Sequence, residues 1–170
     1  YRDALTGIFN IKKFDTVFTN LSMDFINSDK PFSMIIFDID NFHRINDNYS
    51  YQIADNIIRV TVDAINFISR DSYTFIRYGG VKFVMLLPNT RLRNAVVFAE
   101  KIRARTAKMD NMVGKDHIDI TLSVGVDSFE KGDTKSVFFE RVQNYTEKAI
   151  ALGGDRVVFN ESKQNILNGV

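Results

Sequence analysis

Apolar positions recur at helical spacing in four segments of the chain. In the first segment, Phe14, Phe18, Leu21 and Phe25 fall on one face of a helix. The fourth segment is followed by Gly153-Gly154, which is typical of a helix C-terminus. The spacing predicts helices over residues 10–27, 53–68, 92–105 and 134–152.

Between these helices lie shorter apolar runs that are typical of β-strands. The run at residues 32–39 is almost continuously apolar, as expected of a buried central strand. Gly79-Gly80 joins two further runs, which predicts a β-hairpin with positive φ at both glycines. The predicted strands span residues 32–39, 73–78, 81–87, 118–126 and 156–159. This order of elements favours an α+β fold, a sandwich of helices over a mostly antiparallel sheet.

Length and composition indicate one globular domain. The chain has 170 residues, 45% hydrophobic and 25% charged, and no linker-like segment divides it. We expect a core over residues 1–160 and a tail over 161–170. The sequence starts without Met, inside a motif, so we interpret it as a domain of a longer signalling protein. No apolar run is long enough to span a bilayer. We therefore expect a cytoplasmic domain, either free or as the cytoplasmic part of a membrane-anchored protein.

Charge and cysteine content exclude several function classes. Without cysteine there is no disulfide, thiolate metal site or thiol nucleophile. A net charge of +1 gives no electrostatic reason to expect binding to nucleic acid or to a membrane surface. Neither is expected of this domain.

Four stretches, taken together and in this order, resemble the GGDEF (diguanylate cyclase) family. The chain opens with D-A-L-T-G-I-F-N, from Asp3 to Asn10, and continues with F-D-I-D-N-F and I-N-D between Phe37 and Asp47. R-Y-G-G-V-K-F begins at Arg77, and L-S-V-G-V begins at Leu122. The resemblance covers almost the whole chain.

The resemblance implies the palm-like sandwich that this family shares with nucleotide cyclases and polymerases. It also implies that active members join two GTP molecules, one from each of two subunits, into cyclic di-GMP. Two divalent ions held by carboxylates assist the attack of a ribose hydroxyl on an α-phosphate. Mg²⁺ needs oxygen ligands, so apolar groups cannot replace these carboxylates.

The signature hairpin departs from the family pattern where the chemistry needs it most. The segment reads Gly79, Gly80, Val81, Lys82, Phe83, where the family carries two acidic residues before the Phe. By resemblance Asp38, with the backbone carbonyl of Ile39, would hold a metal ion, but Val81 removes the second carboxylate. We therefore expect no catalytic residues and no certain cofactor, with a weakly held Mg²⁺ as the alternative. For Asp40, a structural role is the favoured interpretation.

Other family positions are also altered. Ile150 and Gly154 stand where the family supplies a Lys and an Arg to the triphosphate. The Gly-rich turn before the second predicted helix reads S-Y-Q-I-A-D, from Ser50 to Asp55, without its glycines and His. His43 stands in place of a family Lys and is interpreted as a surface residue; His117 is assigned no role.

Some nucleotide-contacting positions are retained. Asn46 and Asp55 align with the pair that recognises guanine, and Lys82 could meet a phosphate. The alternative is that Asn46 belongs to a turn and that Asp55 caps a helix N-terminus. Arg70 is a remnant of the family's inhibitory R-x-x-D site, in which Tyr73 replaces the Asp.

Three functions follow from these observations. The first is a catalytically inactive regulatory or dimerisation module in cyclic di-GMP signalling. It would have other domains of its polypeptide, or a second copy, as partners. The second is a receptor for GTP or cyclic di-GMP. The third is an active cyclase with an altered metal site.

Overall fold

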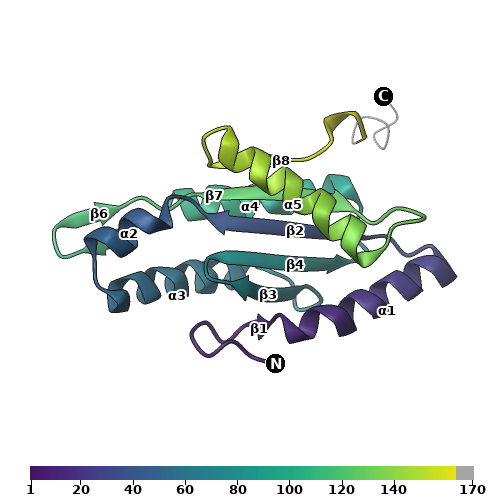
Figure 1. Ribbon diagram of the computed structural model, residues 1–170, viewed down its shortest axis with the longest axis horizontal. Coiled ribbons are helices and arrows are strands. Elements are labelled where there is room, and N and C mark those ends of the chain that lie inside the picture. The colour runs from purple at the N-terminus through teal and green to yellow at the C-terminus, as the bar shows by residue number, and fades with distance from the viewer. Residues whose placement is uncertain (164–170) are drawn as a thin grey trace.

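The computed structural model describes residues 1–163, which form a six-stranded sheet with helices on both faces (Figure 1). The helices are α1 (Lys12–Ser28), α2 (Phe42–Asn48), α3 (Tyr51–Ile68), α4 (Leu92–Ala107) and α5 (Lys135–Ala151). The sheet strands are β1 (Phe9–Asn10), β2 (Phe32–Ile39), β3 (Thr74–Gly79), β4 (Lys82–Pro88), β7 (Leu122–Ser128) and β8 (Arg156–Val158). A separate hairpin consists of β5 (Asn111–Val113) and β6 (Asp116–Ile118). No helix in this part of the chain is long and apolar enough to cross a membrane. Of the predicted tail, residues 164–170 lie outside the described part.

The strand order is β1-β3-β4-β2-β7-β8. The four central strands pair antiparallel, as predicted, while β1 and β8 add to the edges in parallel. Because β2 is central, the polar residues at its C-terminal end lie between the GG hairpin and β7. That end of the sheet is where the candidate site is found.

Two apolar cores lie on opposite faces of the sheet. Alternation along β2 sends Ile35, Phe37 and Ile39 to the face covered by α3 and α4. Met34 and Ile36 face α1 and α5, where Phe side chains dominate. Figure 1 shows α5 crossing in front of the strands. The alternation places Asp38 on the same face as Met34 and Ile36, below α5.

The predicted strand over residues 118–126 is wrong as a single element. The apolar run is divided between two sheets, because Ile118 pairs with Asn111 in the small hairpin while Leu122 pairs with Ile39 in the main sheet. The short elements β1, β5 and α2 were not predicted. Helix α2 forms because Phe42 and Ile45, three residues apart, both bury their side chains.

The hairpin turn is also shifted by one residue from its prediction. Gly79 pairs with Lys82, so Gly80 and Val81 occupy the turn. Of these two and Gly79, only Gly80 has a positive φ, of 57°. The irregular register between Arg77 and Gly79 absorbs the extra residue.

The β5–β6 hairpin is held by a histidine between two carboxylates. Nε2 of His117 lies 2.7 Å from Asp119, and Nδ1 lies 3.0 Å from Asp110. The hydrogen bond with Asp119 and, next, that with Asp110 raise the pKa of His117 above its usual 6.5, although desolvation opposes them.

We expect this hairpin to loosen as the pH rises. A raised pKa means that protonation stabilises the folded hairpin, an effect fully present below pH 6.5 and lost as the pH passes the folded-state pKa. Amide hydrogen exchange of Asn111 and Val113, the hydrogen-bonded positions of β5, should be faster at high pH in the wild type after correction for intrinsic rates. In His117→Gln the corrected rates should not depend on pH, and His43→Gln should behave as the wild type. Equal corrected rates in the wild type at low and high pH would contradict the stabilisation of the hairpin by protonated His117.

Candidate functional site

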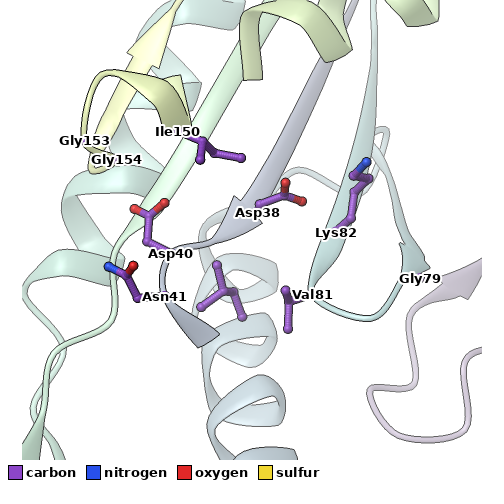
Figure 2. Close-up of a pocket in the computed structure, with 10 residues that line it drawn as sticks. Asp38, Asp40, Asn41, Gly79, Val81, Lys82, Ile150, Gly153 and Gly154 are labelled. Atoms are coloured by element: carbon purple, nitrogen blue, oxygen red, sulfur yellow. The ribbon is translucent and has the colours of Figure 1, made fainter. Parts of the chain in front are cut away.

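A pocket of about 440 Å³ opens at the C-terminal end of β2, between the GG hairpin and the turn that follows α5. Figure 2 shows the residues that line it. They come from three separate parts of the chain and comprise Asp38, Ile39, Asp40, Asn41, Gly79, Val81, Lys82, Ile150, Gly153 and Gly154. The structure therefore brings together the predicted metal position, the altered signature and both altered phosphate positions. We call this the signature pocket.

Asp38 and Lys82 face each other across two neighbouring strands. They are direct partners in the β2–β4 register, so both side chains project from the same face of the sheet (Figure 2). Burial raises the pKa of the Asp38 carboxyl above its usual value; Lys82 acts against this rise, and Asp40 and Glu147 add to it. The Lys82 side chain therefore lines the pocket.

Asp40 is engaged in a structural cluster. Its carboxylate accepts hydrogen bonds from the hydroxyls of Thr121 at 2.7 Å and Ser123 at 2.6 Å, and from the backbone N–H of Asp155 at 2.9 Å. The carboxylate thereby joins the end of β2 to β7 and to the turn after α5. The favoured structural interpretation of Asp40 agrees with this geometry. We call these contacts the Asp40 clasp.

The ligand set does not fit a divalent ion held by two side-chain carboxylates. Val81 offers no ligand, and it packs against the core on the α3/α4 face, directed away from Asp38 (Figure 2). Asp40 already accepts three hydrogen bonds. This leaves Asp38 beside an ammonium group, and within residues 1–163 no cluster of three acidic or histidine side chains forms a metal site.

The two positions at which the resemblance implies basic residues, Ile150 and Gly154, bring no positive charge to the pocket. Ile150 lines the pocket with 47% of its surface exposed, and it offers no charge. Gly154 is buried against the Asp40 carboxylate at a φ of 79°. The neighbouring Asp155 forms an ion pair with Arg103 of α4 at 2.6 Å, so the positive charge of this guanidinium is already paired with a carboxylate.

Comparison with known proteins identifies this architecture. Residues 1–156 match the family described as "Diguanylate cyclase, GGDEF domain". The chain belongs to the GGDEF family. It is 34% identical over 159 residues to the diguanylate cyclase VdcA of Vibrio cholerae, covering 92% of this chain and 46% of that protein. It is 30% identical to the response regulator PleD of Caulobacter vibrioides, covering 92% of this chain and 35% of PleD.

Solved GGDEF structures share the fold. Diguanylate cyclase SiaD of Pseudomonas aeruginosa, solved with its activator SiaC, superimposes with a TM-score of 0.88 at 27% identity, over 93% of this chain and 61% of SiaD. The active GGEEF domain of a Vibrio cholerae diguanylate cyclase superimposes with a TM-score of 0.82 at 28% identity. The match covers 89% of this chain and 96% of that domain's chain. The predicted α+β palm-like sandwich is therefore confirmed. The chain spans less than half the length of the first curated relatives that it matches.

The guanine-recognition pair of the GGDEF family does not line the signature pocket. Asn46 lies in α2 and Asp55 in the second turn of α3, and both are exposed. The two alternative roles are wrong in detail: residues 46–48 are helical, not a turn, and Ser50 caps α3 by accepting from the N–H of Ile53. Their part in nucleotide binding stays a prediction.

The remaining motif residues have visible roles in the GGDEF fold. Arg70 lies 5.9 Å from the ring of Tyr73, which packs edge-on against Phe98 of the core. At the N-terminus Asp3 accepts hydrogen bonds from Thr6 and from Arg77 of β3. Burial opposes ionisation of Asp3, but these contacts outweigh it and lower its pKa. Thr121, which donates a hydrogen bond to Asp40, was not predicted as its partner. The S-x-G motif at Ser123 was the signal, since Ser123 also bonds Asp40.

Proposed function

We propose that this GGDEF domain makes no cyclic di-GMP and serves a longer signalling protein as a regulatory or dimerisation module. The observation that carries the proposal is the Asp38–Lys82 pair. Among the described residues that line the pocket, Asp38 is the carboxylate outside the clasp. It faces the ammonium of Lys82, and Val81 stands where the family mechanism needs a second carboxylate. Ile150 and Gly154 also argue against catalysis, because they are uncharged where the family supplies a Lys and an Arg to the triphosphate. Membership of the GGDEF family supports a role in cyclic di-GMP signalling.

Purified domain should form no cyclic di-GMP from GTP with Mg²⁺ or Mn²⁺. The assay uses a dimerising fusion, because the family reaction needs two subunits, and detects product by chromatography. An active GGDEF domain in the same fusion serves as the positive control. Product above a no-protein control that disappears in Asp38→Ala would overturn the proposal.

Restoring the two acidic signature residues should not restore turnover. Val81→Glu with Lys82→Glu returns carboxylates to the hairpin, but the triphosphate still lacks its two basic partners. Each charge-assisted phosphate contact contributes about 1.5–3 kcal/mol, or roughly one to two decades in rate. Turnover by this double variant close to that of the active control would show that Ile150 and Gly154 matter little.

A second candidate function is that of a guanine-nucleotide receptor, favoured by the orientation of Lys82 into the pocket. An ammonium can meet a phosphate without fixed geometry, and at a pocket open to water this contact is screened by salt. GTP affinity, measured by calorimetry, should then change little between EDTA and excess Mg²⁺. It should fall in Lys82→Ala and in Asp55→Ala. Strong Mg²⁺ dependence, or affinity unchanged by both substitutions, would leave only the interaction module.

A further inference from the structure

A second cavity, of about 330 Å³, lies beside the signature pocket where the first turns of α1 and α5 meet β3. Three aromatic rings line it: Phe14 of α1, Tyr78 of β3 and Phe139 of α5. Phe139 meets Phe14 edge-on at 5.8 Å and stacks on Tyr78 at 5.2 Å. We call it the aromatic pocket. Its size and its mainly apolar lining are those of small-molecule sites.

The lining selects for a flat and uncharged group. Aromatic rings favour another ring in a stacked or edge-on position. The charges at the rim cancel, because Lys135 of α5 and Asp15 of α1 form an ion pair at 2.6 Å. Tyr78 is 42% exposed, so a ring that covers it would remove apolar surface from water.

Tyr78 connects this cavity to the signature pocket. Its ring stacks on Phe139 of the aromatic pocket, and the ammonium of Lys82 lies 5.7 Å from the centre of the same ring. Lys82 in turn is the cross-strand partner of Asp38. A group that moves the Tyr78 ring therefore changes the contact that positions Lys82.

We infer that the aromatic pocket binds a planar, uncharged aromatic group, and that its occupancy repositions Lys82 in the signature pocket through Tyr78. Neither part depends on nucleotide binding or on the absence of catalysis. The coupling is reciprocal, so a ligand that holds Lys82 away from Tyr78 alters the affinity of the aromatic pocket.

Indole is the probe for binding. The protein contains no Trp, so indole fluorescence reports only on the ligand. We expect saturable binding with a Kd on the order of 1 mM, reasonable for so small a molecule. Amide NMR signals of Tyr78 and Phe139 should shift along the same curve. Ser136→Phe fills the cavity from an exposed lining position, so it should weaken indole binding by a factor on the order of ten or more.

Val137→Phe is the matched control, because Val137 is exposed on the same helix turn but does not line the cavity. Its indole affinity should equal that of the wild type. Non-saturable binding, or equal weakening by both substitutions, would overturn the site.

The coupling is tested on the Lys82 side chain. Its ε-methylene protons feel the ring current of Tyr78, so their NMR shift should change as indole saturates the wild type. In Tyr78→Leu the shift should start near the value of an isolated lysine and stay constant during the titration. An unchanged Lys82 signal in the saturated wild type would overturn the coupling and leave the pocket as an isolated binding site.

Discussion

Gly125→Ala should cost the fold about 3 kcal/mol of unfolding free energy, the upper part of the range for overpacked cores. A Cβ at this position in β7 would lie 2.5 Å from the backbone N and the hydroxyl of Thr146 and 2.5 Å from the carbonyl of Val142. All three atoms belong to the buried inner face of α5, so the whole helix must move away from the sheet. The Thr146 hydroxyl, which donates to the carbonyl of Ile36 at 3.0 Å, would lose that contact.

Urea denaturation followed by circular dichroism measures this loss. Gly79→Ala is the control, because a Cβ there meets nothing within 4 Å and its φ is not positive. Its unfolding free energy should stay within about 0.5 kcal/mol of the wild type. If both variants unfold at the same urea concentration, α5 is not packed as closely on β7 as the structure has it.

The contact at Gly125 also shows why the family motifs carried the fold prediction so well. The L-S-V-G-V segment is a packing requirement: Ser123 bonds Asp40, and Gly125 admits α5. Periodicity located the long helices because each has one strongly buried face, and a continuous apolar run located β2 because it is buried on both faces. It failed at residues 118–126, where an apolar run serves two sheets, and at α2, which is too short to show a period.

The candidate site was predictable in composition but not in geometry. Alignment to motifs named Asp38, Val81, Lys82, Ile150 and Gly154, and the structure gathers all of them in one pocket. Alternation alone could not decide which face Lys82 takes, because a one-residue shift of the hairpin turn reverses it. Asn46 and Asp55 were placed with this site by motif only, and they lie outside its lining.

Side-chain contacts between distant segments were beyond the sequence. The stacking of Tyr78 on Phe139 joins residues that no motif relates. Arg103 and Asp155, 52 positions apart, form another such pair. Such contacts depend on the position and orientation of α4 and α5 on the sheet, which periodicity does not specify.

Ile150 and Gly154, which stand where the family carries basic residues, differ in how closely the fold encloses them. Ile150 is 47% exposed, so Ile150→Lys should be accommodated with a stability change within about 0.5 kcal/mol. Gly154 is instead enclosed: a Cβ there would lie 2.7 Å from Oδ2 and 2.9 Å from Oδ1 of Asp40. That carboxylate cannot swing aside freely, because the clasp holds it with three hydrogen bonds.

Gly154→Arg, which restores the family residue, should therefore destabilise the domain by about 2.5–4 kcal/mol. The positive φ of 79° contributes about 1 kcal/mol of strain, and displacing a carboxylate from its hydrogen bonds adds about 1.5–3 kcal/mol.

Gly80→Arg is the matched control, since its φ is 57° but a Cβ there meets nothing within 4 Å. It should show the strain alone. Urea denaturation of both variants separates the two contributions. Equal stabilities would mean that the Asp40 clasp yields without cost. A larger loss in Gly154→Arg would mean that the clasp itself disfavours arginine at this position of the pocket.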